Sequence, residues 1–272
     1  MLTDAHCHPF DLSRVLNGAE EERRRRGVMC AASATELEEF AYNEELARRA
    51  KAEGSPPLLP CFAVHPQLPA ARNRNTGDKP EAGLLLLETL AREGRLAAVG
   101  ETGFDLFNSA FRETEAIQDK LFAAQVETAL CYGLPLVLHI RKAMHKVFAY
   151  SRTLTKCKAV IFHSWPGTLG EGEALLKRGV NAFFSFGNGI LLNHREAMRC
   201  CAAFPLSRLL IETDAPYQPP RGREHSAWED LPGILAAATA LRREAGTAGS
   251  LVNELETAVE SNFRSAFGRR AS

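Results

Sequence analysis

Two histidines stand two positions apart near the start of the chain, in the stretch LTDAHCHPF at residues 2–10. Imidazole is the commonest protein ligand for transition metals. Side chains two positions apart on a β-strand point to the same side, so His6 and His8 can bind one ion while Cys7 points away. Two ligands are too few for a stable site, and the rest of the chain must supply more.

Four further residues of ligand type lie at the ends of apolar segments: Glu101, His139, His163 and Asp214. Six imidazole and carboxylate ligands exceed the four of an ordinary tetrahedral site, but they suit two divalent ions about 3.5–4 Å apart. Such ions hold a water that loses its proton near neutral pH and attacks an electrophilic centre. The residue types therefore predict a metal-dependent hydrolase.

Eight apolar segments alternate with segments of helical period. The apolar segments are residues 2–8, 27–33, 58–65, 96–105, 135–141, 159–165, 181–187 and 209–216. Several are apolar on both faces, as strands of a covered parallel sheet are. Helices are predicted at residues 35–54, 80–94, 113–133, 142–153, 168–178, 193–203, 229–245 and 250–267. This order predicts an α/β fold, a slightly distorted TIM (β/α)8 barrel, with a doubly wound open sheet as the alternative.

The six ligand-type residues fall at the C-terminal ends of these strands, where barrel enzymes build their sites. The first and eighth strands are neighbours in a closed barrel, so His6, His8 and Asp214 are expected to bind one ion. Asp4, deeper on the same face as His6, is expected to support the site without being a ligand. Asp214 is also a catalytic residue here, as the general base or as the group that orients the water.

The second ion is expected to lie between the fifth and sixth strands, bound by His139 and His163. Glu101 projects from the middle of the set and is expected to bridge the ions, which makes it the other catalytic residue. This donor set suits Zn, Mn, Fe, Co or Ni better than Mg, and the sequence does not choose among the six metals.

Composition limits the class of protein. The chain has 272 residues with a net charge of zero, and it shows no linker, so we expect one domain over residues 1–272. It lacks an apolar run long enough to span a membrane, and its start has no signal-peptide pattern. Seven cysteines form no CxxC pair, which favours reduced thiols and a cytoplasmic location. A monomer is expected. The charge run EEERRRR is expected to be a solvated helix end, far from the site.

The chain resembles the TatD family of metal-dependent deoxyribonucleases, within the amidohydrolase-like barrels, over nearly its whole length. The resemblance is carried by DAHCH at 4–8, AVHP at 63–66, GETGFD at 100–105, the Gln118, Phe122 and Gln125 helix, PLVLHIR at 135–141, HS and G at 163–167, ETDAPY at 212–217, and Asn262, Phe263 and Phe267. It implies that the six residues above are the metal ligands. It also implies hydrolysis of DNA phosphodiester bonds, with nucleotides removed from a strand end. The expected substrate is DNA that is single-stranded or is bound at strand ends.

Some substrate-loop residues depart from the family pattern: Gln67, Lys142, Trp165 and residues 225–228. The substrate-binding candidates are His65, Arg141, Arg221 and Arg223. The arginines can neutralise phosphates, although Arg221 and Arg223 can equally be solvated loop residues. His65 can contact a phosphate or support the site. Trp165 and Trp228 can stack on a base or pack inside a loop. Glu212 and Asp105 are expected to orient histidines.

Two other functions compete with the nuclease. One is a metallohydrolase of a small ester, amide or lactone on the same barrel. Many such enzymes bridge their metals with a carboxylated lysine on the fourth strand, where this chain has Glu101 and no lysine. The other is a barrel that has lost its activity and serves as a binding module. The complete ligand set argues against it.

Overall fold

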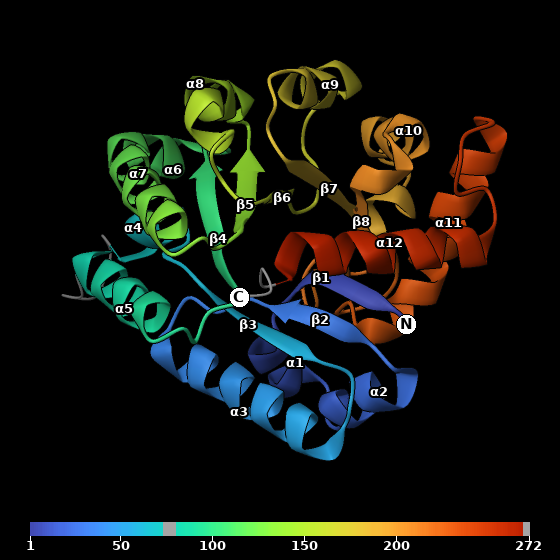
Figure 1. Ribbon diagram of the computed structural model, residues 1–272, viewed down its shortest axis with the longest axis horizontal. Helices are drawn as coiled ribbons and strands as arrows, with labels where there is room; N and C mark the ends of the chain where they lie inside the picture. Colours follow the sequence, from blue (N-terminus) through green and yellow to red (C-terminus); the bar gives the residue numbers. More distant parts are fainter. Residues whose placement is uncertain (73–79, 269–272) are drawn as a thin grey trace.

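A computed structural model of the chain describes residues 1–72 and 80–268. In this part of the chain, eight parallel strands follow one another in sequence order around a ring (Figure 1). They are β1 (Thr3–Cys7), β2 (Met29–Ala32), β3 (Leu58–Phe62), β4 (Ala98–Asp105), β5 (Leu136–Arg141), β6 (Val160–Phe162), β7 (Ala182–Phe186) and β8 (Leu209–Ile211). The predicted TIM barrel is confirmed, because an open doubly wound sheet would reverse its strand order.

Helices connect the strands and surround the ring. They are α1 (Pro9–Val15), α2 (Ala19–Arg26), α3 (Leu37–Glu53), α4 (Leu68–Arg72), α5 (Pro80–Arg92), α6 (Ser109–Glu113), α7 (Glu115–Cys131), α8 (Met144–Leu154), α9 (Leu169–Lys177), α10 (Arg195–Ala203), α11 (Leu231–Glu244) and α12 (Val252–Phe267), with 3-10 turns η1 (Asn188–Ile190), η2 (Leu206–Arg208) and η3 (Trp228–Asp230). Each predicted helix is present within two residues at either end. None of the described helices is long and apolar enough to cross a membrane.

The ring closes between β8 and β1 just beyond the end of β8. The backbone amide of Asp214 donates to the carbonyl of His6 at 2.9 Å, and the amide of His8 donates to the carbonyl of Ala215 at 2.7 Å. The predicted strand at 209–216 is therefore a strand only as far as Ile211, and its remainder runs along β1. Because of this closure, Asp214 lies beside His6 of β1 and His8, which directly follows β1.

The interior of the barrel is filled from the strands and from the last helix. Small inward side chains such as Ala5, Ala31 and Ala98 belong to the same buried cluster as Phe263 and Phe267 of α12. In Figure 1, α12 crosses the middle of the ring. The centres of the two phenyl rings lie 4.7 Å apart, and the rings pack with these small side chains.

Aromatic side chains pack against one another outside β6 and β7. Trp165 lies edge-on to Phe162 and Phe184, with ring centres 5.2 and 4.7 Å apart, and it also contacts Phe204. Trp165 is 4% exposed and Trp228 is 1% exposed. Both tryptophans pack inside the fold, so neither can stack on a base without a rearrangement.

The sequence led us to expect that the charge run at residues 20–26 is solvated. This expectation is wrong for one of its arginines. Arg23 of α2 is fully buried. Its Nη1 donates to the carbonyls of Val28 at 2.6 Å and Pro56 at 2.9 Å, and Glu20 accepts from its Nε at 2.7 Å. The guanidinium therefore joins the turn before β2 to the turn before β3 at the end of the barrel opposite the site.

We expect Arg23→Met to lower the free energy of unfolding by about 2–4 kcal/mol, because it leaves buried carbonyls without a donor. Chemical denaturation measures this loss. Arg25→Met in the same run is the control: Arg25 is exposed, so the change should cost less than about 0.5 kcal/mol. Equal losses in the two variants would contradict a structural role for Arg23.

Candidate metal centre

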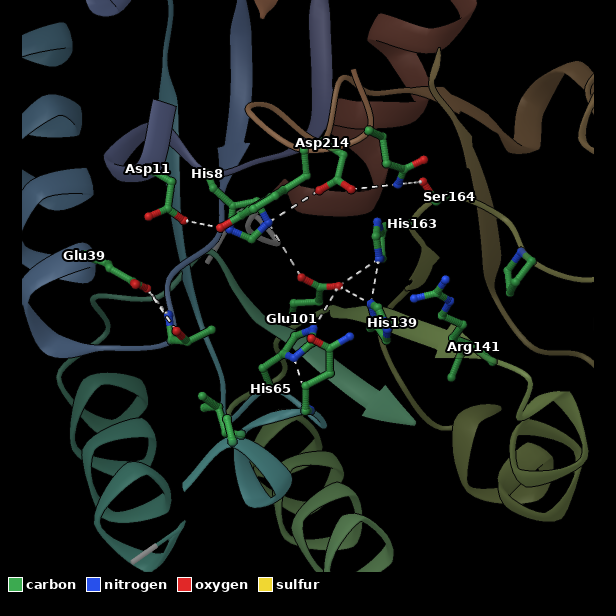
Figure 2. Close-up of a pocket in the computed structure, with 18 residues that line it drawn as sticks. His8, Asp11, Glu39, His65, Glu101, His139, Arg141, His163, Ser164 and Asp214 are labelled. Atoms are coloured by element: carbon green, nitrogen blue, oxygen red, sulfur yellow. Dashed lines mark hydrogen bonds and ion pairs between the residues drawn. The ribbon is translucent and has the colours of Figure 1, made fainter. Parts of the chain in front are cut away.

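A pocket of about 810 Å³ opens at the C-terminal ends of the strands. Figure 2 shows Glu101 at its centre, with His8 and Asp214 toward one side, His139 and His163 toward another, and His65 close by. This is the end of the barrel that the sequence predicts for the site. The pocket falls within the range of about 300–1,000 Å³ that is typical of small-molecule sites.

The first group of donor atoms comes from β1, β4 and the segment after β8. His6 Nε2 lies 3.1 Å from His8 Nε2 and 3.4 Å from Asp214 Oδ1. Glu101 Oε2 lies 3.2 Å from His6 Nε2 and 3.7 Å from His8 Nε2. Ligand bonds of about 2.0–2.1 Å in a tetrahedral site place neighbouring donors about 3.3 Å apart. The donor set therefore fits one transition-metal ion.

The second group gathers around the other oxygen of Glu101. Glu101 Oε1 lies 2.7 Å from His139 Nδ1, 2.7 Å from His163 Nε2 and 3.4 Å from His65 Nε2. His139 Nδ1 and His163 Nε2 are themselves 3.2 Å apart. The structure thus brings together all six predicted ligands. It also brings in His65, which the sequence led us to expect as a substrate contact, and the loop after β3 places it there.

Glu101 reaches both groups because β4 is irregular. The pairing of β4 with β5 shifts between Val99 and Thr102, which turns the Glu101 side chain toward the pocket. Beyond the shift, Gly103 pairs with His139, with φ of 138°. A Cβ atom on Gly103 would lie 2.1 Å from the carbonyl oxygen of His139. Only glycine allows this close approach.

The charges in the centre stabilise an ionised Glu101. Burial raises the pKa of its carboxyl group, but His163, His65, His6 and His139 outweigh burial and hold the pKa well below its usual value. Burial lowers the pKa of His163, yet the Glu101 carboxylate outweighs it and raises that pKa well above 6.5. The negative bridge and the imidazoles thus stabilise each other's charged forms. Such a set is suited to a cation that replaces the protons.

Carboxylates lie beside both imidazoles of the second donor group, and the one beside His139 is hydrogen-bonded to it. His139 Nε2 lies 3.2 Å from Asp105 Oδ2, which accepts from Gln67 Nε2 at 2.7 Å. His163 Nδ1 lies 3.5 Å from Glu212 Oε1. These contacts agree with the predicted orienting roles of Asp105 and Glu212. Gln67 departs from the family pattern, and its uncharged amide donates to the Asp105 carboxylate.

Asp4 does not share the inward face of His6. The pairing of β1 with β2 shifts between Asp4 and Cys7, so simple alternation fails here. The Asp4 carboxyl accepts from the Thr213 amide at 3.0 Å and from its Oγ1 at 2.6 Å. Burial raises the pKa of Asp4 to about 8. Asp4 therefore supports the site, as the sequence led us to expect, but it does so by fixing the backbone next to Asp214.

Gln218 is a site residue that the sequence did not reveal. Its Nε2 donates to Asp214 Oδ2 at 2.7 Å and to Ser164 Oγ at 2.6 Å. Ser164 in turn donates from its backbone amide to Glu212 Oε1 at 2.7 Å. This chain of contacts leads from the first donor group to the second. The only signal in the sequence is an amide residue directly after the string ETDAPY.

We expect Gln218→Leu to weaken metal binding at the first donor group by about tenfold. The variant removes the hydrogen bond to Asp214 Oδ2, which holds the carboxylate so that Oδ1 faces His6 and His8. Competition with a chromophoric chelator measures the affinity. The control is Gln118→Leu. Gln118 is a buried glutamine of α7 that accepts from the backbone amide of Asp105 and does not contact Asp214. An affinity in Gln218→Leu equal to that of the parent would show that Asp214 needs no such support.

The four substrate-binding candidates lie at different distances from the centre. His65 and Arg141 line the pocket, whereas Arg221 and Arg223 do not. Arg223 pairs with Glu229 at 2.5 Å and with Asp230 at 3.0 Å. These carboxylates neutralise the Arg223 guanidinium. Arg141 is therefore the arginine that the structure places closest to the chemistry.

Residues 3–268 match the family described as TatD related DNase. The chain is 33% identical to the 3'-5' ssDNA/RNA exonuclease TatD of Klebsiella pneumoniae over 66% of this chain and 68% of that protein. It is 28% identical to the uncharacterized metal-dependent hydrolase YjjV of Escherichia coli over 89% and 90% of the two chains. The crystal structure of Escherichia coli YJJV, described as a TATD homolog, superposes with a TM-score of 0.81, at 26% identity over 99% and 98%.

Proposed function

Because this chain belongs to the TatD-related DNase family, we propose that it is a divalent-metal-dependent nuclease that removes nucleotides from the end of a single strand of DNA. A relative with a third of its residues identical is named as an exonuclease on single-stranded DNA and RNA. The observation that carries the proposal is the position of Glu101, which presents one carboxylate oxygen to each donor group. That arrangement is suited to two ions and to phosphodiester hydrolysis.

The residues have separate roles in this proposal. His6, His8 and Asp214 hold one ion, and His139 and His163 hold the other, with Glu101 between them. Bound ions supply a water acidified to near neutral pH and a positive charge for the phosphate. Gln218 donates to Asp214 Oδ2, which leaves Oδ1 facing the first donor group. Asp214 is therefore better suited to be a ligand that orients the water than to be the general base.

Other residues surround the phosphate. Arg141 lines the pocket and is suited to bind a phosphate oxygen. His65, whose Nε2 lies 3.4 Å from Glu101 Oε1, can complete the second donor group. Arg221 and Arg223 remain candidates for contacts farther along a strand. The single domain, a monomeric state and a cytoplasmic location stay predictions.

The proposal is tested with end-labelled single-stranded DNA in a panel of Mn²⁺, Mg²⁺, Zn²⁺, Co²⁺, Ni²⁺ and Fe²⁺. We expect stepwise shortening from one end with at least one of these metals, and no shortening after chelation. Elemental analysis of the active protein should give two ions per chain. Failure of every metal to release nucleotides would overturn the nuclease, and hydrolysis of small esters or amides in the same preparation would then favour the other metallohydrolases.

A further inference from the structure

The pocket carries opposite charges on opposite sides. Figure 2 shows Asp11 and Glu39 on one side of Glu101 and Arg141 on the other. Asp11 belongs to α1, the helix that begins directly after His8. Glu39 lies in the first turn of α3. Because phosphates are drawn to the guanidinium and repelled by the carboxylates, a nucleic-acid strand cannot lie in this pocket equally well in both directions.

Arg141 belongs to a built feature at the edge of the pocket. Its guanidinium carbon lies 3.7 Å from the centre of the Phe107 ring, which is 48% exposed. The Phe107 amide donates to Asp105 Oδ1 at 2.9 Å, and the Leu106 amide donates to the Arg141 carbonyl at 2.9 Å. We call this pair the Arg141–Phe107 lip. It is tied to Asp105, the residue that orients His139.

The lip is suited to bind phosphate. In the described part of the chain, no carboxylate lies within 4.0 Å of the Arg141 guanidinium. A guanidinium stacked on a ring keeps its N–H groups in its own plane, where they can form paired hydrogen bonds to phosphate oxygens. The ring of Phe107 restricts the side-chain freedom of Arg141, so less entropy is lost when a phosphate binds.

The opposite wall is fixed and negative. Asp11 Oδ2 accepts from the Tyr217 hydroxyl at 2.9 Å, and Glu39 Oε2 accepts from the Thr35 amide at 2.6 Å. The Tyr217 ring lies edge-on to His8, with ring centres 5.1 Å apart. Burial, with the charges of Asp11 and Glu39, raises the pKa of Tyr217. We call these carboxylates the Asp11–Glu39 wall.

We propose that the strand enters over the Arg141–Phe107 lip and that its terminal nucleotide lies against the Asp11–Glu39 wall, which accepts a terminal hydroxyl group and rejects a terminal phosphate. The inference rests on the nuclease function proposed above and adds the direction of the strand and the chemistry of the accepted end. Every internal nucleotide carries a phosphate on both sides, whereas an end can carry a hydroxyl. The wall therefore restricts cleavage to ends.

Four oligonucleotides of one sequence test the proposal: a 5'-labelled pair ending in a 3'-hydroxyl or a 3'-phosphate, and a 3'-labelled pair beginning with a 5'-hydroxyl or a 5'-phosphate. At the end that the protein attacks, we expect the hydroxyl form to be cleaved at least about tenfold faster, because like charges in a pocket cost several kcal/mol. Similar rates for the two forms would overturn the inference.

Neutralising the wall should remove this preference. Asp11→Asn combined with Glu39→Gln keeps an acceptor for Tyr217 and for the start of α3, so the fold should survive. We expect the phosphate-ended rate to rise to within about threefold of the hydroxyl-ended rate, since most of the like-charge cost disappears. Glu38→Gln, on α3 but outside the pocket lining, should keep the parent preference. An unchanged preference in the double variant would overturn the role of the wall.

The lip is tested separately. Phe107→Ala should raise KM for the hydroxyl-ended oligonucleotide by about fivefold with a smaller change in kcat, because the guanidinium loses its support. Phe107→Tyr should restore the parent KM. A KM for Phe107→Ala equal to that of the parent would overturn the lip. Absence of cleavage of all four oligonucleotides would overturn the nuclease function itself, and so differs from equal cleavage of the hydroxyl and phosphate forms.

Discussion

Replacing Glu101 with alanine should lower nuclease activity at least about a thousandfold, equivalent to about 4 kcal/mol of transition-state stabilisation. Among the described residues, this carboxylate alone faces both donor groups, at 3.2 Å from His6 and 2.7 Å from His139 and His163. Its loss leaves each group one ligand short. Steady-state cleavage of an end-labelled oligonucleotide and metal analysis of the same sample measure the two effects.

A second measurement separates loss of the bridge from loss of the fold. The Glu101 charge raises the pKa values of His139 and His163. In the metal-free protein, Glu101→Gln keeps the shape of the side chain and removes its charge, so both imidazole pKa values should fall and the rings should be less protonated at neutral pH. NMR titration follows these shifts. Activity in Glu101→Ala within tenfold of the parent would exclude a bridging role.

Replacing Gly103 with alanine should lower the free energy of unfolding by about 4 kcal/mol, from backbone strain and overpacking together. A Cβ atom would lie 2.1 Å from the His139 carbonyl oxygen, and φ of 138° is strained for any other residue. To relieve the clash, β4 must move away from β5 at the position of His139. The same substitution should therefore weaken binding of the metal held by the second donor group.

Gly233→Ala is the matched control for Gly103→Ala. Gly233 lies inside α11, and a Cβ atom there would meet nothing within 4 Å. This substitution should stabilise the protein by up to about 1 kcal/mol, because alanine favours a helix. Thermal and chemical denaturation compare the two variants. Similar stability of Gly103→Ala and the parent would show that the close approach of β4 and β5 is not required.

The barrel and the gathering of the six candidate ligands at one end of it could be predicted because both follow from local patterns. Segments apolar on both faces mark covered parallel strands, and polar residues at their C-terminal ends share one face of a barrel. His139 and Glu101 lie in strands as expected, whereas His163 directly follows β6 and Asp214 stands three residues after the end of β8. The residue types at strand ends were thus enough to predict which six side chains come together, although the predicted strand lengths were not all correct.

The remaining features depend on irregular backbone that local patterns do not determine. Shifts in the pairing of β1 and β4 turn Asp4 away from the pocket and Glu101 into it, and alternation of side chains cannot anticipate either. Gln218 and His65 reach the centre through loops, whose paths are set by contacts between distant parts of the chain. Phe107 could not be linked to Arg141 until the pairing of β4 with β5 was known.

The seam between β8 and β1 has a consequence for the order in which the protein acquires its metals during synthesis. His6 and His8 are made about two hundred residues before Asp214, which reaches them only when its backbone amide bonds to the His6 carbonyl. A partly synthesised chain therefore lacks the complete first donor group. Nearly the whole barrel must be made before this donor group is complete, so under the proposed function an ion would be retained there only after folding.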